Sequence, residues 1–131
     1  MPMAQLNSVE MFYEEDGEGE PLLITTGWAR AERAFAAQRE ALARHYRAIR
    51  HDHRHIGRTL ATDEPTSIGM LADDLAQLLD FLSIPTARVL AGGGMGALVG
   101  MELAVRHPEK ASPIHPGPPL IMTDPLLVFI T

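Results

Sequence analysis

Hydrophobic and polar residues follow two different periods along the chain, and each period predicts one kind of element. Continuous apolar runs at Pro21–Gly27 and at residues 87–93 predict strands that are buried on both faces. Residues 4–16 alternate apolar and polar around a turn at Asn7–Ser8, which predicts two short antiparallel strands. The segment Tyr46–His53 predicts a further strand.

Three segments carry the helical period, in which apolar residues recur every three or four positions. The first, residues 31–46, predicts an amphipathic helix with its charges on the outer face. The second begins after Thr66 or Ser67, either of which can cap it, and stops before Pro85. The third covers residues 95–110. Because strands and helices alternate, the sequence predicts an α/β fold, with a mostly parallel sheet flanked by helices.

Residues 1–110 are predicted to form the folded core, and residues 111–131 a proline-rich tail. The tail holds five of the ten prolines of the chain and then reads LLVFI. The prolines exclude a regular helix, while Leu126–Ile130 is predicted to form a terminal strand. An unpaired apolar strand is an aggregation hazard, so this strand is expected to pair with another one.

Composition narrows the function without identifying it. The 131 residues carry a net charge of −6 and include no cysteine. The acidic balance argues against nucleic acid as a partner, and the lack of cysteine excludes disulfides, thiolate metal ligands and cysteine nucleophiles. No apolar run is long enough to cross a bilayer and no signal peptide is evident, so we expect a cytoplasmic protein without a membrane partner.

Several motifs occur in the order typical of one enzyme family. The segment MFYEEDGEGEPLLITTG resembles two strands of that family, and ADDLAQLLDFLSI and ELAVRHPEK resemble two of its helices. HDHRHIGRT stands where the family has P-D-x-R-G-H-G-R-S, with matches at Asp52, Arg54, Gly57 and Arg58. On these motifs, the first 110 residues resemble the N-terminal half of an α/β-hydrolase of the esterase, lactonase and epoxide-hydrolase kind. The resemblance implies a truncated α/β-hydrolase fold.

The sequence AGGGMGA occupies the place of the nucleophile elbow, which in this family reads G-x-S-x-G. Gly92 and Gly96 match the flanking glycines, and Gly94 stands where the serine is expected. Glycine has no attacking atom, so the acyl-enzyme route is closed; glycines here also relieve backbone strain, which is compatible with any function. Thr26-Gly27 replaces the His-Gly of the family, whose acid and histidine come from later strands. No Ser-His-Asp mechanism is therefore expected.

Three of the six histidines lie within five residues, at His51, His53 and His55. Residues two apart point the same way on an extended segment, so the spacing predicts one shared face and a divalent metal site, with zinc as the expected ion. Asp52 is the candidate catalytic side chain, either as a ligand or as the group that orients one. The competing interpretation is a solvent-facing loop with incidental histidines. His115 in the tail is a further candidate ligand.

The candidate substrate-binding residues come from two loops at the C-terminal edge of the sheet, where open parallel sheets bind ligands. They are Thr26, Gly27 and Trp28 after one strand, and Gly93, Gly94 and Met95 at the elbow. A metal held by the three histidines would lie beside this glycine-widened pocket.

Three functions remain open at this point. The first is a metal-dependent hydrolase of activated esters (a carboxyl ester, a lactone or a phosphotriester), in which a metal hydroxide replaces the serine. The second is a catalytically inactive α/β-hydrolase relative that binds a small molecule or a protein at the old pocket. The third is a fragment that only folds and self-associates.

The predicted assembly is an obligate homodimer. In the family, further strands pair beyond the nucleophile strand at residues 88–92, and that pairing is missing here. An apolar strand at an open edge exposes backbone donors and a hydrophobic face, so a two-fold partner is expected to cover it. The tail is then expected to cross between the subunits, in the dimer interface.

Overall fold

The computed structural model of the protein describes residues 2–110 and 127–130, and these residues form a single seven-stranded sheet with helices on both faces. In space the strands are ordered β1-β2-β4-β3-β6-β7, and β5 pairs with β2. In chain order they are β1 (Met3–Gln5), β2 (Val9–Asp16), β3 (Glu20–Thr25), β4 (Tyr46–His51), β5 (Leu60–Ala61), β6 (Arg88–Gly92) and β7 (Leu127–Ile130).

The sheet is mixed rather than mostly parallel, while the predicted α/β class is confirmed. Among the described strands, the parallel pairs are β3–β4 and β3–β6, one on each side of the central strand β3. The pairs β1–β2, β2–β4, β2–β5 and β6–β7 are antiparallel. Antiparallel pairing follows where short turns join neighbouring strands, as between β1 and β2, whereas parallel neighbours need a crossover connection. The parallel part is therefore limited to the three strands that lead into the candidate site.

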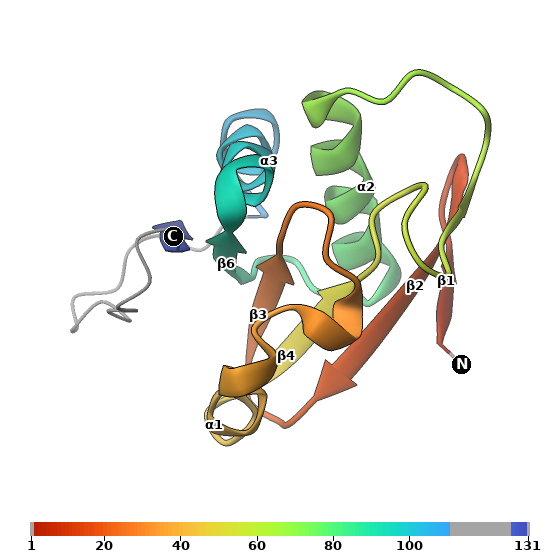
Figure 1. Cartoon of the computed structure of the whole chain (residues 1–131). Coiled ribbons are helices and arrows are strands. Elements are labelled where there is room, and N and C mark those ends of the chain that lie inside the picture. The colour runs from red at the N-terminus through yellow and green to blue at the C-terminus, as the bar shows by residue number, and fades with distance from the viewer. Residues whose placement is uncertain (1, 111–126, 131) are drawn as a thin grey trace.

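Helices cover the two faces of the sheet unequally. Figure 1 shows α2 and α3 side by side on one face, and the short α1 on the other. The helical elements are η1 (Ala31–Arg33), η2 (Ala36–Gln38), α1 (Arg39–Ala43), α2 (Ile68–Phe81) and α3 (Gly93–Arg106).

Alternating residues of the central strands face the two layers. On β3, Leu23 packs in the larger core with α2 and α3, while its neighbours Leu22 and Ile24 pack in the smaller core under α1. The same alternation places Val89 of β6 in the larger core and Leu90 in the smaller one. Because both faces are buried, these strands read as continuous apolar runs, as the sequence predicted.

The long helix α2 begins where the sequence placed its cap. The Ser67 hydroxyl oxygen accepts a hydrogen bond from the Met70 N–H at 3.1 Å, which satisfies one of the backbone donors of the first turn. Leu71, Leu75, Leu78 and Leu79 on its inner face are buried in the larger core. In the described residues, no helix is long and apolar enough to cross a membrane.

The predicted helix over residues 31–46 is wrong: the segment forms two 3-10 turns and the five-residue α1. Phe35 between the turns has a left-handed backbone, with φ of 52°, which a continuing helix does not allow. In a continuous helix the Gln38 N–H would donate to the Ala34 carbonyl. Here the Ala34 carbonyl accepts a hydrogen bond from Arg50 Nε at 3.1 Å, and the Gln38 N–H donates to the Phe35 carbonyl. Tertiary contacts to β4 therefore override the helical period.

The tail strand pairs with the nucleophile strand of the same chain. β7 lies antiparallel to β6, and its four residues pair with Val89–Gly92. The edge of β6 that was expected to be open is thus covered within one chain, which removes the original reason for a two-fold partner. Residues 111–126 and 131, which include His115, lie outside the described residues.

Candidate functional site

The elbow is a direct passage from strand to helix. β6 ends at Gly92, which is extended with φ −131° and ψ 156°, and α3 begins at the next residue. A Cβ added to Gly96 would stand 2.8 Å from Thr26 Cα, too close for any side chain, so this glycine lets α3 pack onto the loop after β3. A Cβ added to Gly94 would meet no other described atom within 4 Å. As far as the described residues show, the position of the missing nucleophile is therefore open space.

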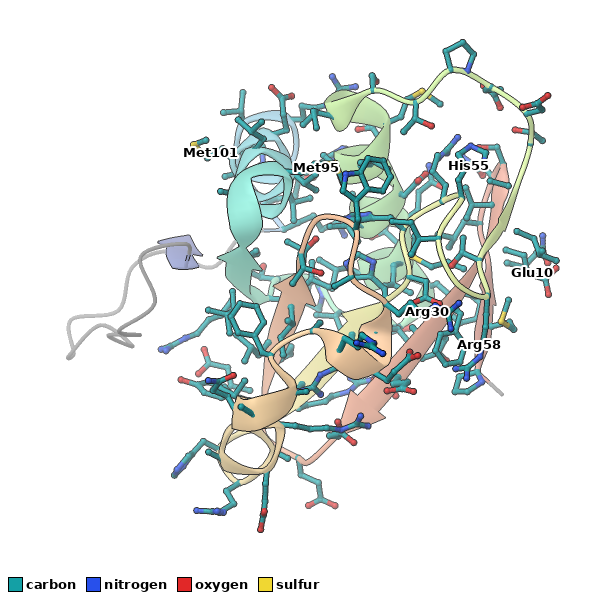
Figure 2. The ribbon with its side chains drawn as sticks, in the orientation of Figure 1. Glu10, Arg30, His55, Arg58, Met95 and Met101 are labelled. Atoms are coloured by element: carbon teal, nitrogen blue, oxygen red, sulfur yellow. The ribbon has the colours of Figure 1, made fainter. Side chains whose placement is uncertain are left out.

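The first turn of α3 brings backbone donors to this space. The first four N–H groups of a helix have no acceptor within it, and Gly92 has no side chain that could cap them. The macrodipole adds a partial positive charge at the same end. Gly27 faces this turn, because its Cβ would lie 3.4 Å from Met95 Cβ. Figure 2 shows Met95 at the start of α3. The Cβ distances make Thr26 and Gly27 neighbours of this turn, so they lie with Met95 beside the opening, the exposed space at Gly94.

Two apolar residues beside the elbow, the predicted Trp28 and Leu98, do not enclose that opening. Trp28 is 72% exposed and Leu98 on α3 is 49% exposed. Gly94 is itself exposed, so the opening is accessible to solvent.

His53 ties the loop after β4 to the loop after β3. Its Nε2 lies 3.0 Å from the Thr26 carbonyl oxygen and 3.3 Å from Thr25 Oγ1. The ring of His51 stands edge-on to it, with centroids 4.5 Å apart. Both side chains are buried. Burial lowers the pKa of His53 to about 4. Burial and the neighbouring His53 ring lower the pKa of His51 well below 6.5. Both imidazoles are therefore neutral at pH 7.

The predicted shared face of three histidines is not formed. β4 ends at His51, and the chain then turns, so the alternation that the prediction assumed stops after the first histidine. His55 has a left-handed backbone with φ of 66° and is exposed, and Figure 2 shows it well apart from Met95. Among the described residues, no group of three histidine, aspartate or glutamate side chains could hold a metal ion.

Asp52 organises the backbone around it instead of facing the opening. Its Oδ1 accepts the Ala31 N–H at 2.7 Å, and its Oδ2 accepts the Arg58 N–H at 2.9 Å. Its own carbonyl accepts the Thr59 hydroxyl at 2.7 Å. The side chain is fully buried. Both carboxylate oxygens are thus occupied, and the contacts favour a structural role over the predicted catalytic one.

Arg54 anchors the same loop to α2, a role that sequence reasoning did not assign. Its guanidinium donates two hydrogen bonds of 2.8 Å to the Asp74 carboxylate, and both side chains are buried. The Asp74 hydrogen bonds raise the pKa of Arg54. Only the match of Arg54 to the family pattern marked it in the sequence, because an aspartate on the inner face of an apolar helix gave no sign of its partner.

Relatives of this chain are named as carbamate hydrolases and a bromoperoxidase, and its structural neighbours are α/β-hydrolases, although no protein-family model matches the chain. The protein named carbamate hydrolase RutD from Azorhizobium caulinodans is 36% identical over 110 residues, which is 84% of this chain and 41% of that protein. The enol-lactonase from Burkholderia xenovorans LB400 superimposes with a TM-score of 0.77 at 32% identity, over 84% of this chain and 44% of that one. Est816, an N-acyl homoserine lactone degrading enzyme, superimposes with a TM-score of 0.76 at 27% identity, over 84% of this chain and 42% of that one. The chain belongs to the α/β-hydrolase superfamily.

Membership of this superfamily assigns roles to two residues of the elbow. The chain spans about two fifths of the length of the curated relatives it matches. In α/β-hydrolases the elbow presents a serine, and the N–H of the following residue stabilises the oxyanion. Here Gly94 and Met95 occupy those two positions, so this α/β-hydrolase keeps a backbone donor and lacks the nucleophile.

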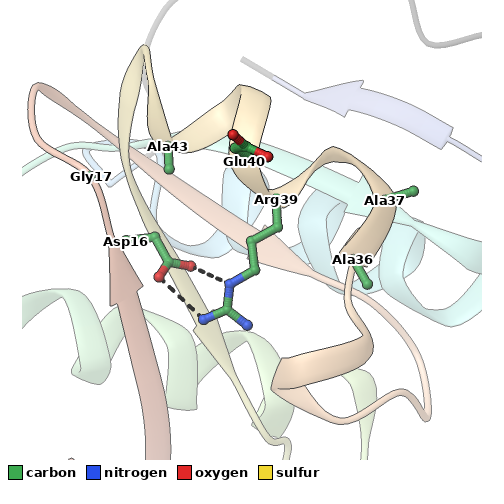
Figure 3. Close-up of a pocket in the computed structure, with 7 residues that line it drawn as sticks. All are labelled: Asp16, Gly17, Ala36, Ala37, Arg39, Glu40 and Ala43. Carbon is green, nitrogen blue, oxygen red and sulfur yellow. Dashed lines mark hydrogen bonds and ion pairs between the residues drawn. The ribbon is translucent and has the colours of Figure 1, made fainter.

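A cavity of about 480 Å³ lies at the opposite edge of this α/β-hydrolase sheet. Its lining comes from the end of β2 and from η2 and α1: Asp16, Gly17, Ala36, Ala37, Arg39, Glu40 and Ala43. Figure 3 shows Arg39 paired with the Asp16 carboxylate, through contacts of 2.8 and 3.1 Å. Asp16 pairs with Ala48 near the start of β4, whereas the elbow follows the end of β6. The cavity is therefore separate from the candidate site.

Proposed function

We propose that the chain binds small carbonyl compounds of the ester, lactone or carbamate type at the elbow, and that water attacks them directly. The observation that carries the proposal is Gly94, whose missing side chain leaves room for a water or a substrate carbonyl beside the first turn of α3. Relatives and structural neighbours named as a carbamate hydrolase and lactonases support the substrate class.

The backbone around Gly94 suits the charge that forms in such a reaction. When water adds to a carbonyl, negative charge develops on the carbonyl oxygen, and pre-positioned N–H donors stabilise it. The Met95 N–H and the positive end of α3 supply that stabilisation without any side chain. The attacking water loses a proton to solvent and the alkoxide or phenoxide leaves, so activated esters are the expected substrates. No covalent intermediate with Gly94 forms, because glycine offers no nucleophile.

The test uses a 4-nitrophenyl ester and a lactone with two variants at one position. Gly94→Leu fills the opening and is expected to lower kcat/KM about tenfold or more, whereas Gly94→Ala leaves most of the space and most of the rate. Binding of a phosphonate analogue, measured by calorimetry, separates turnover from binding alone. Saturable binding without hydrolysis would replace the proposal by the inactive binding module, and equal rates for the Leu and Ala variants would place the reaction elsewhere.

Metal dependence stays a prediction of the sequence. The buried pair of His51 and His53 supports it. Within the described part of the chain, neither nitrogen of His51 nor Nδ1 of His53 has a hydrogen-bond partner, so these atoms are available to a ligand. A catalytic zinc site uses three protein ligands, and these two imidazoles are one short. The residues described do not fit the ion, so no step of the proposed reaction passes through it.

The homodimer also stays a prediction, on a new basis. Leu98, Met101 and Val105 recur at helical spacing on α3, and about half or more of each side chain is exposed. We propose that a second copy covers this stripe, because exposed apolar rows of this kind mark interfaces. Met101→Lys is expected to shift a dimer to monomer in light scattering, while Leu60→Lys, at an exposed residue on β5, is the control.

The cytoplasmic location likewise stays a prediction.

A further inference from the structure

His53 holds one peptide group of the candidate site in a fixed plane. The Thr26 carbonyl can only accept a hydrogen bond, so the 3.0 Å contact requires that His53 Nε2 carries the proton. The neutral ring is therefore the Nε2–H tautomer, and Nδ1 bears a lone pair. Among the described atoms Nδ1 has no hydrogen-bond partner, so its only environment is the packed interior beside His51.

The direction of this carbonyl determines the direction of the next amide. A trans peptide is planar, and its C=O and N–H point opposite ways. The Thr26 carbonyl points to His53, which follows β4. The Gly27 N–H in the same plane therefore points away from the β4 side. The elbow follows β6, which lies on the opposite side of β3 from β4.

Packing contacts place the loop after β3 beside the elbow. The position of a Gly27 Cβ is 3.4 Å from Met95 Cβ, and Thr26 Cα is the nearest neighbour of a Cβ at Gly96. The loop after β3 thus lies directly against the first turn of α3. Thr26 stands where the family has a histidine, and in this chain the imidazole bound to this loop belongs to His53 of the neighbouring loop.

We propose that His53 is a positioning residue that aims the Gly27 N–H at the opening beside Gly94, where it acts as a second oxyanion donor with the Met95 N–H. The inference rests on the proposed function for its catalytic consequence, and on the hydrogen bond alone for its structural one. It requires that His53 stays uncharged and keeps its donor on Nε2. It does not require any contact of His53 with substrate.

The wild-type protein gives the first test, without substrate and without mutation. Nitrogen-15 NMR of the histidine rings is expected to find the Nε2–H tautomer at His53, with slow exchange of that proton. The Nδ1–H tautomer in the folded protein would overturn the proposal, whether or not the protein hydrolyses esters.

Variants then test the consequence. His53→Gln keeps an N–H donor for the Thr26 carbonyl, and His53→Leu removes it. His51→Leu is the matched control, because it alters the same buried pair without a bond to Thr26. We expect His53→Leu to shift the Gly27 amide resonance and to lower kcat about tenfold with little change in KM. His53→Gln is expected to restore most of the wild-type kcat and most of the wild-type Gly27 chemical shift.

His51→Leu is expected to lower the melting temperature and to leave the Gly27 resonance near its wild-type value. An unshifted Gly27 resonance in a folded His53→Leu protein would overturn the inference, as would a His53→Gln variant that behaves like His53→Leu. If the wild-type protein hydrolyses nothing, the proposed function fails by itself, and the tautomer and the Gly27 resonance still decide the role of His53.

Discussion

A Cβ on Gly57 would stand 2.1 Å from Oδ2 of Asp52, the oxygen that accepts the Arg58 N–H. Gly57 also has a positive φ of 56°, which side-chain-bearing residues rarely adopt. Two independent constraints thus meet at one residue. The loop after β4 closes around the Asp52 carboxylate only because this position is glycine.

Gly57→Ala is therefore expected to destabilise the protein by about 2 kcal/mol or more, since it adds both strain and a clash. Gly94→Ala is the matched control, because its Cβ meets open space in the first turn of a helix. The control is expected to change the free energy of unfolding by less than about 1 kcal/mol. Urea denaturation of both variants measures the difference. Equal losses would show that Asp52 does not organise the loop as described.

Gly94→Ser is expected to fold normally and to gain no serine-esterase activity. The hydroxyl fits, but a serine needs a base within hydrogen-bond reach, and His53, buried and bonded to Thr26, does not provide one. Incubation with a fluorophosphonate probe and intact-mass measurement check this. Rapid labelling of the variant, with the wild type unlabelled, would reveal a base at the elbow.

The buried histidine pair predicts a loss of stability in mild acid. The pKa of His53 is about 4 in the folded protein and about 6.5 in the unfolded chain, so between these values the unfolded state binds more protons. The free energy of unfolding is therefore expected to fall as the pH drops from about 6.5 to 4, by about 3 kcal/mol for His53 alone. His51, whose pKa is also lowered, adds to the loss in the same direction.

Chemical denaturation at several pH values, for the wild type and for His53→Gln, measures this contribution. The difference between the two proteins is expected to shrink as the pH falls. A constant difference from pH 7 to pH 4.5 would contradict the burial of a neutral imidazole at this position.

Metal analysis tests the three-histidine site directly. Because His55 is exposed while His51 and His53 are buried, and no three possible ligands gather among the described residues, His55→Ala is expected to leave the zinc content after equilibrium dialysis unchanged. Treatment with a chelator is expected to leave the hydrolysis rate unchanged as well. If His55→Ala loses a stoichiometric metal, or if chelated protein regains activity only with zinc, the loop rearranges to form the site that the sequence predicted.

Much of the fold followed from local signals, and most of the site did not. Ser67 and the leucines of α2 act within one element, so their roles are readable from spacing. The glycines of the elbow were recognisable because a strand-to-helix passage requires them in a fixed order. The segment after Arg30 misled the helical prediction because Arg50 takes the Ala34 carbonyl, a contact invisible in the local pattern.

The shared face predicted for the three histidines does not form, for a related reason. It assumed an extended backbone through His55, whereas β4 ends at His51 and Asp52 gathers the backbone into a tight loop. The bond between His53 and Thr26 joins two loops distant in sequence, so no periodicity could indicate it. Tertiary hydrogen bonds thus decided what each histidine does.

The position of β3 has a consequence for how the protein reaches its native state. On one flank Leu22 pairs with Ala48, and on the other with Arg88, much farther along the chain. Closing the longer loop costs more entropy, so the β3–β4 pair is expected to form early in folding and β6 to dock afterwards. The elbow at the end of β6 then takes its shape only in the last steps. During refolding, burial of α1 against the sheet should precede recovery of ligand binding.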